Sequence, residues 1–223
     1  MTKLKVPVQV GRRWYYRLSQ IVIGLFFRTY FRHVTSGVEN IPESRGAVIA
    51  TNHVSVLDPI LIGLDLPRPV YYMAKKSLHE IPLFGRLIRA YNAFPVNRRG
   101  SSRGALKMAR EIVEKGNLLL IFPEGSRGNG GGLRRFKPGI GKILTETGAP
   151  VVPGFIGGAA QVWPANRWFP RPVKTKMIFG QPVNYNNFAA GENRRKRYQK
   201  VADDIQERVA ELNQSEIKNS HKD

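Results

Sequence analysis

The sequence predicts an α/β fold, in which helices cover a central β-sheet. Six short apolar runs have the length of buried strands, and segments with helical patterns lie between them. Strands that alternate with helices are typical of a sheet with helices on its faces. The chain has 223 residues, of which 42% are hydrophobic and 23% charged, as in one globular domain. It contains no cysteine, which excludes a disulfide framework, a thiolate nucleophile and a cysteine zinc site.

Local patterns predict the individual elements. The predicted strands span residues 47–51, 70–74, 93–96, 118–122, 151–156 and 175–179. One helix is predicted where apolar residues recur every three or four positions, at Ala105, Met108, Ala109, Ile112 and Val113. Ser101 or Ser102 can cap this helix and Gly116 can end it. A second amphipathic pattern predicts a helix over residues 193–213, followed by a frayed tail over residues 214–223.

The charge of the chain is strongly positive. Lys and Arg total 36 against 16 Asp and Glu, for a formal net charge of +20. Residues 1–38 hold seven basic residues and no acidic one, and residues 85–142 hold thirteen basic and three acidic ones. Such a surface attracts polyanions: nucleic acid, an anionic membrane or a phosphorylated substrate. Only the charge supports nucleic-acid binding, because no zinc pattern, helix-turn-helix signature or RNA-binding aromatic block is present.

The N-terminal arm, residues 1–36, combines aromatic and apolar residues with arginines. Its longest uncharged run, residues 18–27, is too short to cross a bilayer, and no signal-peptide cleavage site follows it. A helix lying in the membrane interface fits this pattern, because arginines reach lipid phosphates while apolar side chains enter the bilayer. A core helix of the domain is the alternative. The lack of acidic residues favours the membrane.

The first motif that can carry chemistry is Asn52-His53-Val54-Ser55-Val56-Leu57-Asp58-Pro59, directly after the predicted strand 47–51. Asp suits a helix N-cap and Pro the first helical position, so His53 is predicted in the turn between a strand and a helix. This turn can bring the Asp58 carboxylate to one ring nitrogen of His53 and leave the other nitrogen free to take a proton. A substrate hydroxyl would then replace a protein nucleophile. The same spacing also arises by chance, with Asp58 only capping a helix.

Two further motifs place cations at predicted strand ends. Phe122-Pro123-Glu124-Gly125-Ser126-Arg127-Gly128 closes one strand; its glycine lets backbone amides approach an anion, and Arg127 supplies a forked donor. Phe94-Pro95-Val96-Asn97-Arg98-Arg99 closes another strand in the same way. Arginines at strand ends suit a phosphomonoester, although ordinary surface turns can have the same composition.

Together and in this order, these blocks resemble the 1-acylglycerol-3-phosphate O-acyltransferases, within the wider glycerolipid acyltransferases. The resemblance runs from about residue 38 to residue 182 and includes the whole N-H-x-S-x-x-D block, the Phe-Pro-Glu-Gly-Ser-Arg block and a Lys-x-x-Leu-x-x-x-Pro-x-x-Gly pattern over residues 75–85. It implies a mixed, mostly parallel sheet wrapped by helices. We expect three parts: an N-terminal amphipathic, membrane-associating arm over residues 1–36, an acyltransferase domain over 37–213 and a flexible tail over 214–223.

The resemblance also implies roles for single residues. His53 would be the general base that takes the proton of the acceptor hydroxyl, and Asp58 would orient His53 and stabilise its imidazolium form. The acceptor phosphate and its pocket are assigned to Arg98, Glu124, Gly125, Arg127 and Lys137. Support of the site is assigned to Asn52, Ser55 and Pro153. Neither a metal nor a cofactor is expected, because an acyl thioester of acyl carrier protein or coenzyme A acts as co-substrate.

The implied reaction moves a fatty acyl group to the 2-hydroxyl of 1-acylglycerol 3-phosphate (lysophosphatidic acid) and yields phosphatidic acid. Glycerol 3-phosphate or another lysophospholipid is the alternative acceptor, and a lipid-binding protein on an inactive acyltransferase fold is a further alternative. Expected partners are lysophosphatidic acid, the acyl thioester, an anionic membrane surface and an acidic acyl carrier protein, and not nucleic acid. We expect a peripheral or monotopic protein on the cytoplasmic face of the inner membrane.

Overall fold

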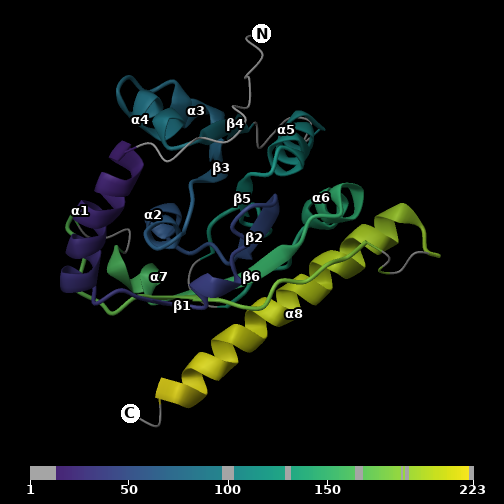
Figure 1. The fold of residues 1–223 in the computed structure, drawn as a ribbon. Helices are drawn as coiled ribbons and strands as arrows, with labels where there is room; N and C mark the ends of the chain where they lie inside the picture. The colour runs from purple at the N-terminus through teal and green to yellow at the C-terminus, as the bar shows by residue number, and fades with distance from the viewer. Residues whose placement is uncertain are drawn as a thin grey trace.

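The computed structural model of the chain describes residues 14–96, 103–128, 132–163, 168–186, 188 and 191–220, without the side chains of residues 103 and 215–220. Helices and strands alternate along it (Figure 1). The strands are β1 (Val34–Ser36), β2 (Ala47–Thr51), β3 (Val70–Lys75), β4 (Ala93–Val96), β5 (Leu118–Ile121), β6 (Val151–Gly157) and β7 (Lys176–Phe179). The helices are α1 (Trp14–Tyr30), η1 (Val38–Asn40), α2 (Asp58–Gly63), α3 (Lys76–His79), α4 (Phe84–Ala90), α5 (Arg103–Glu114), α6 (Gly139–Thr147), α7 (Ala159–Val162) and α8 (Arg194–Ser220).

The described strands form one sheet in the order β1-β7-β6-β2-β5-β3-β4. Neighbouring strands are parallel, except that β6 and β7 are antiparallel. The predicted fold class, a mixed and mostly parallel sheet wrapped by helices, is therefore confirmed. Because parallel strands end at the same edge of a sheet, the loops that follow β2, β5 and β6 come together, and ligand sites of such sheets lie at that edge.

Alternating strand residues build a hydrophobic core on each face of the sheet. Along β2, Val48 and Ala50 join the core formed with α5, α6 and α8. Ala47 and Ile49 join the opposite core, formed with α1, α2 and α7. This alternation is what the pleat of a strand dictates, and helices accordingly cover both faces in Figure 1. β2 is buried along its whole length, so its end gives a firm base for the loop that follows.

The predicted strands agree with the structure to within one residue at either end. β1 was not predicted, because only Val34 of its three residues is apolar. It pairs with β7, so residues 34–36 belong to the sheet and the predicted boundary after residue 36 does not separate the arm from the domain. The last helix continues to Ser220, seven residues beyond its predicted end, so the expected tail is helical over residues 214–220.

Helix α1, from the predicted arm, packs on the domain along one stripe and is exposed along the other. Tyr16, Gly24 and Phe27 are buried at helical spacing, and the Gln20 side chain donates to the carbonyl oxygens of Gly63 and Leu66. The exposed stripe holds the large apolar residues Trp14, Leu18, Ile21, Val22, Leu25 and Phe26. In the described part of the chain, no helix has the length and apolar character needed to cross a bilayer.

Candidate active site

The loop between β2 and α2 brings His53 and Asp58 into contact. Asp58 is fully buried, and its Oδ2 lies 2.8 Å from Nδ1 of His53. The same oxygen accepts the backbone N–H groups of Val54 and Ser55, at 2.7 and 2.8 Å. A carboxylate can only accept hydrogen bonds, so Nδ1 carries the hydrogen and Nε2 carries the lone pair. No residue in the described part of the chain bonds to Nε2, which leaves this nitrogen able to take a proton.

The helix start differs by one residue from the expectation. Leu57, and not Asp58, occupies the N-cap position of α2, and Asp58 is the first helical residue. Its carboxylate turns back onto the loop that precedes the helix, where it holds three donors. Pro59 is therefore the second helical residue and not the first, but it still lies in the first turn, where a missing N–H costs nothing.

The turn after β5 holds His53 from a second side. The Phe122 ring stacks on the His53 imidazole, with ring centroids 4.0 Å apart and planes at 17°. The backbone N–H of His53 donates to Oε1 of Glu124 at 3.1 Å, and the His53 carbonyl accepts the N–H of Gly128 at 2.7 Å. The ring and both backbone polar groups of His53 are thus fixed, so its orientation is set before any substrate binds.

Glu124 is a buried acid with an unpaired oxygen. Only 2% of its surface is exposed, and its Oε2 has no hydrogen-bond partner among the described residues. Burial raises the pKa of the Glu124 carboxyl group, because the charged form loses its hydration. The hydrogen bond from the His53 backbone and the charges of His53 and Arg134 oppose this rise.

Cationic side chains surround the turn after β5. Gly125 has φ +78°, and a Cβ atom there would lie 2.5 Å from Nζ of Lys137, so the lysine side chain passes over this glycine. The backbone N–H of Lys137 also donates to the Pro123 carbonyl. Arg127 is exposed, and Arg134 donates to the Ser126 hydroxyl at 2.6 Å. Arg134 and Lys137 thus lie beside the turn that carries Glu124, and Arg127 belongs to the turn itself. Arg98, the other arginine assigned to the phosphate, lies outside the described residues.

The three residues expected to support the site lie in or beside the loop between β2 and α2. Asn52 accepts the backbone N–H of Ile156 at 2.8 Å and donates to the carbonyl of the same residue at 3.0 Å, which ties the start of the loop to β6. The Ser55 hydroxyl accepts the N–H of Leu57 at 3.3 Å. Pro153 is buried in β6, opposite Ala50 of β2.

Comparison with known proteins identifies the family. A family model described as Acyltransferase matches residues 32–157, more than half of the chain. The chain belongs to this acyltransferase family. Among solved structures, the acyltransferase is similar to the 1-acyl-sn-glycerophosphate (LPA) acyltransferase PlsC of Thermotoga maritima. The two chains share 30% identity and superpose with a TM-score of 0.72, over 90% of this chain and 81% of the other.

Curated relatives agree with the family. A Bacillus subtilis protein named 1-acyl-sn-glycerol-3-phosphate acyltransferase is 29% identical over 175 residues, which cover 78% of this acyltransferase and 84% of the relative. A Borreliella burgdorferi protein of the same name is 34% identical over 122 residues, which cover 54% and 49%. The match thus spans most of the first relative and about half of the length of the second.

Sequence reasoning missed two residues of the acyltransferase site. It gave Phe122 no role, because the stacking depends on β5 lying beside β2 and no local pattern reveals that neighbour. It also omitted Arg134, which reaches Ser126 from a separate segment. The run of basic residues around Lys137 was the signal that could have indicated it.

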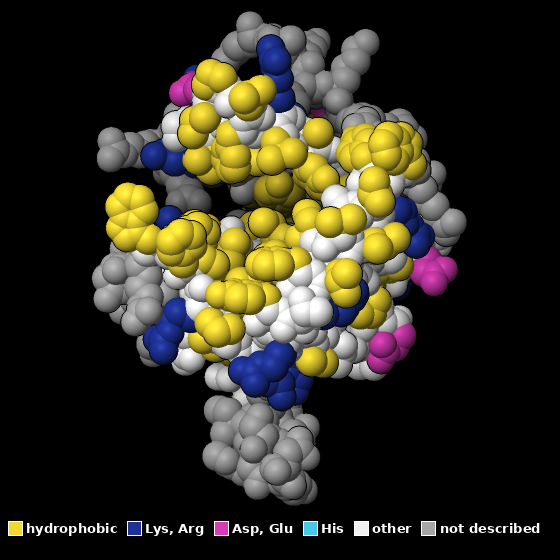
Figure 2. Space-filling model, turned by 90° about the vertical axis from the view of Figure 1, so that its left-hand side faces the viewer, with side chains coloured by type: hydrophobic (Ala, Val, Ile, Leu, Met, Phe, Trp, Pro, Cys, Tyr) yellow, Lys and Arg dark blue, Asp and Glu magenta, His cyan; other side chains and the backbone are white. Residues whose placement is uncertain are grey.

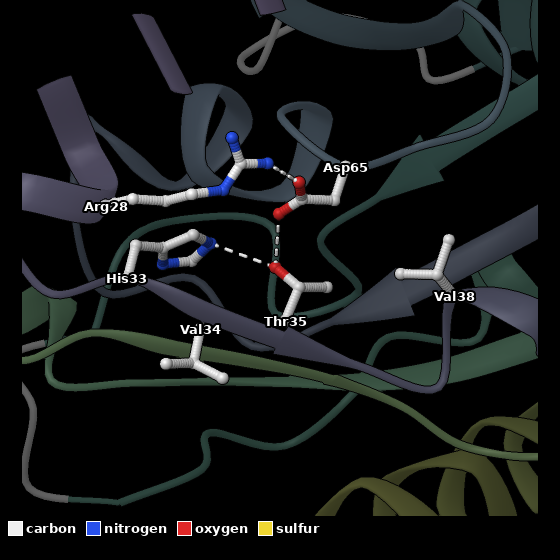
Figure 3. Close-up of a pocket in the computed structure, with 6 residues that line it drawn as sticks. All are labelled: Arg28, His33, Val34, Thr35, Val38 and Asp65. Carbon is white, nitrogen blue, oxygen red and sulfur yellow. Dashed lines mark hydrogen bonds and ion pairs between the residues drawn. The ribbon is translucent and has the colours of Figure 1, made fainter. Parts of the chain in front are cut away.

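A second buried histidine of the acyltransferase lies in a different setting, shown in Figure 3. Nδ1 of His33 lies 2.9 Å from the Thr175 hydroxyl, and Nε2 lies 3.1 Å from that of Thr35. Thr35 donates in turn to Asp65, which also pairs with Arg28 of α1. His33, Thr35, Asp65 and Arg28 line an open pocket of about 320 Å³. Among the described residues, no group of three or more His, Asp or Glu side chains is arranged to hold a metal ion.

Proposed function

We propose that this protein transfers a fatty acyl group from an acyl thioester to the 2-hydroxyl of 1-acylglycerol 3-phosphate, giving phosphatidic acid. The observation that carries the proposal is the His53 ring: its Nδ1 bonds to the buried Asp58, and no described residue bonds to its Nε2. The ring lies beside the turn after β5 and its cationic side chains. A poised base next to an anion-binding turn suits an acceptor that has both a hydroxyl group and a phosphate.

The reaction needs only one general base and the two substrates. Nε2 of His53 takes the proton of the acceptor hydroxyl as its oxygen attacks the thioester carbonyl. The resulting imidazolium ion is stabilised by the Asp58 carboxylate at Nδ1. When the tetrahedral intermediate collapses, the carbon–sulfur bond breaks and the leaving thiolate takes the proton back from Nε2. His53 is neutral again, and we propose that no cofactor takes part.

The cations of the turn after β5 would hold the acceptor phosphate. Arg127 offers a forked donor, Arg134 is already oriented by Ser126, and Lys137 crosses Gly125. Arg98 joins this group by the family resemblance alone. Oε2 of Glu124, which has no partner among the described residues, can accept a hydrogen bond from a glycerol hydroxyl, which would orient the glycerol backbone next to His53.

The acceptor and the product are amphiphiles, so the enzyme would work at a membrane surface. The exposed stripe of α1 supports this location, because a surface rich in apolar side chains on a strongly cationic protein suits an anionic bilayer. Figure 2 shows hydrophobic side chains gathered on the side of the molecule that carries α1. We place the protein on the cytoplasmic face of the inner membrane. Either acyl carrier protein or coenzyme A can carry the donor acyl group.

The test is an acyl-transfer assay with purified protein in mixed micelles. Lysophosphatidic acid, glycerol 3-phosphate and lysophosphatidylcholine are offered separately, each with palmitoyl-coenzyme A or palmitoyl-acyl carrier protein, and products are identified by mass spectrometry. We expect phosphatidic acid from lysophosphatidic acid only. We also expect loss of product in His53→Ala and retention in His33→Gln, which changes the other buried histidine.

Two outcomes would contradict the proposal. Turnover of another acceptor in place of lysophosphatidic acid would overturn the acceptor but keep the base. Full activity of a folded His53→Ala variant would overturn the mechanism itself. Circular dichroism of both variants separates a loss of chemistry from a loss of fold.

A further inference from the structure

The hairpin formed by α3 and α4 exposes a row of large apolar side chains. It connects β3 to β4, and within α4 only Gly85 and Ile88 are buried. The short helix α3 buries no residue at all. The exposed apolar residues of this hairpin are Leu78, Ile81, Leu83, Phe84 and Leu87. Water is a poor solvent for such a row, so an apolar partner is expected to cover it.

Leu83, at the tip of the hairpin, is the extreme case. Its surface is 76% exposed, and its backbone has φ +63° and ψ −57°. The Phe84 N–H donates to the Pro82 carbonyl at 2.7 Å, so Leu83 is the central residue of a γ-turn with positive φ, a rare and strained conformation. A side chain with a Cβ atom is disfavoured there, yet a leucine projects into solvent. Contacts within the domain do not explain a leucine at this position, because most of its surface is exposed.

Backbone contacts hold the tip in a fixed shape. The Gly85 N–H donates to the Ile81 carbonyl at 2.8 Å, and a Cβ atom at Gly85 would lie 2.3 Å from the His79 carbonyl oxygen. The end of α3 and the start of α4 are therefore in close contact, and this contact keeps Leu83 in its projecting position. A preformed apolar projection loses little conformational entropy when it enters another phase.

The charges around the hairpin are mostly positive. Lys75, Lys76, Arg86 and Arg89 lie in or beside it, against a single acidic residue, Glu80. Glu80 is 3.9 Å from Lys76, and both side chains are well exposed. A cationic rim around an apolar tip is complementary to a bilayer with anionic headgroups and an apolar interior.

The hairpin continues the exposed surface of α1. The Tyr15 hydroxyl of α1 donates to the Ala90 carbonyl at the end of α4, and the ring of Tyr91 contacts those of Tyr15 and Tyr16. In Figure 2, hydrophobic side chains cover both the upper part of the face, where α3 and α4 lie in Figure 1, and the part below it, where α1 lies. Both elements therefore present apolar side chains on the same side of the molecule.

We infer that the α3–α4 hairpin is a second membrane-docking element beside α1, and that Leu83 enters the acyl region of an anionic phospholipid bilayer. The inference rests on the proposed function, since a lipid substrate requires contact with a bilayer. It adds to that function a route by which the acceptor can pass from the bilayer to His53. The hairpin follows the end of β3, at the edge of the sheet where His53 lies, so insertion would bring the catalytic loop close to lipid.

The absence of cysteine allows a direct test of depth. Leu83→Cys creates a single thiol, which can be labelled with a polarity-sensitive fluorophore. Glu207→Cys, at an exposed position of α8 on the other face of the sheet, is the matched control. Vesicles of phosphatidylglycerol and phosphatidylcholine should shift the emission of the Leu83→Cys label to the blue and leave the control label unchanged.

Two results would overturn the inference. One is unchanged emission of the Leu83→Cys label when the protein cosediments with the vesicles. The other is a blue shift without vesicles that grows with protein concentration, because a second copy of the chain would then be the partner.

Leu83→Gly tests the same inference without threatening the fold. Glycine relieves the strain at positive φ and removes no buried contact, so thermal stability should equal or exceed that of the wild type. Vesicle affinity should fall about tenfold, the order of effect expected for one leucine side chain withdrawn from an apolar phase. Equal vesicle affinity of Leu83→Gly and wild type would contradict the inference.

Acyl-transfer assays keep this inference distinct from the proposed function. With lysophosphatidic acid in vesicles, Leu83→Gly should lose activity in parallel with affinity. With a short-chain lysophosphatidic acid that is monomeric in water, it should match the wild type. Failure of the wild type on both acceptors would count against the proposed function, whereas equal activity of both proteins on vesicles would count against the hairpin alone.

Discussion

Two buried histidines of this protein differ in what surrounds their second ring nitrogen. His53 and His33 are 9% and 4% exposed. His53 bonds directly to the carboxylate of Asp58 through Nδ1, and no described residue bonds to its Nε2. Both nitrogens of His33 meet threonine hydroxyls, and His33 reaches the carboxylate of Asp65 only through Thr35. A general base needs one oriented nitrogen and one free nitrogen, and of these two histidines only His53 has that arrangement.

The same comparison explains why α1 is attached where it is. Asp65, the carboxylate near His33, bonds to Arg28 of α1, so the His33 network connects the exposed helix to the domain. The His53 network connects the ends of two central strands instead. Both networks thus consist of a histidine, a carboxylate and hydroxyl or amide donors, but one attaches α1 to the domain and the other joins the ends of central strands.

The largest expected difference is in kcat/KM, between variants of the two carboxylates Asp58 and Asp65. Asp58→Asn should lower kcat/KM about 10³-fold or more, because an amide cannot stabilise the imidazolium ion and can hold His53 in the wrong tautomer. Asp65→Asn should change kcat/KM by less than about threefold, since the described bonds of Asp65 are to Arg28 and Thr35 and not to His53. Steady-state kinetics of the two variants measures this contrast. Similar losses in both would remove the distinction between the networks.

A smaller effect is expected at Phe122, the ring that stacks on His53 but has no counterpart at His33. Phe122→Leu should lower kcat about tenfold and leave KM for the acceptor unchanged, because the imidazole plane is less well fixed and the imidazolium loses the π face. Phe122→Tyr retains the ring and should restore most of the activity. If leucine and tyrosine behaved alike, the stacking would have no part in orienting the base.

The pH dependence of stability should report on His33. Burial lowers the pKa of His33 below its ordinary 6.5, with the Asp65 charge opposing. The unfolded chain therefore binds the proton first, so His33 contributes full stability above 6.5 and less as the pH falls below it. His33→Gln should be less stable at about pH 8 and should lose less further stability on acidification. Melting temperatures across this range give the measurement. Parallel curves for both proteins would rule out His33 as the source.

The stability contributed by Glu124 should change with pH in the opposite direction to that of His33. This change should be the smallest of the expected effects. The pKa of Glu124 is raised by burial, so the folded state favours the neutral acid, and the contribution to stability is lost as the pH rises through the raised pKa. Glu124→Gln keeps an acceptor for the His53 N–H and carries no charge. Its melting temperature, relative to that of the wild type, should therefore rise by a few degrees between about pH 4 and about pH 8. A constant difference would contradict this assignment.

Local sequence patterns predicted the strands from β2 to β7, because each of these contains a short apolar run. The central strand β2 agrees with its prediction at both ends. β1 was missed, because its partner β7 comes from a distant part of the chain and only one of its three residues is apolar. The end of α8 was placed too early because the apolar pattern stops near Leu212, whereas the helix continues over polar residues.

In the site, the sequence predicted contacts within one loop and missed contacts between loops. The bond between His53 and Asp58 follows from a five-residue spacing and a turn, and the structure contains it. The stacking of Phe122 and the bond from Arg134 to Ser126 depend on strand order and on the path of a later segment. The roles of the phosphate-binding residues stay predictions, and Arg98 lies outside the described residues.

The two hydrogen bonds between Asn52 and Ile156 have a consequence for the newly made chain. β2 pairs with β5 and β6, which follow it by roughly 70 and 100 residues, so its neighbours join late and such long-range pairing is slow. His53 is therefore synthesised roughly 100 residues before the strand that ties down its loop. A nascent chain that lacks β6 lacks the partner to which Asn52 attaches this loop. On the proposed function, a chain truncated before β6 should therefore be unable to acylate lipid.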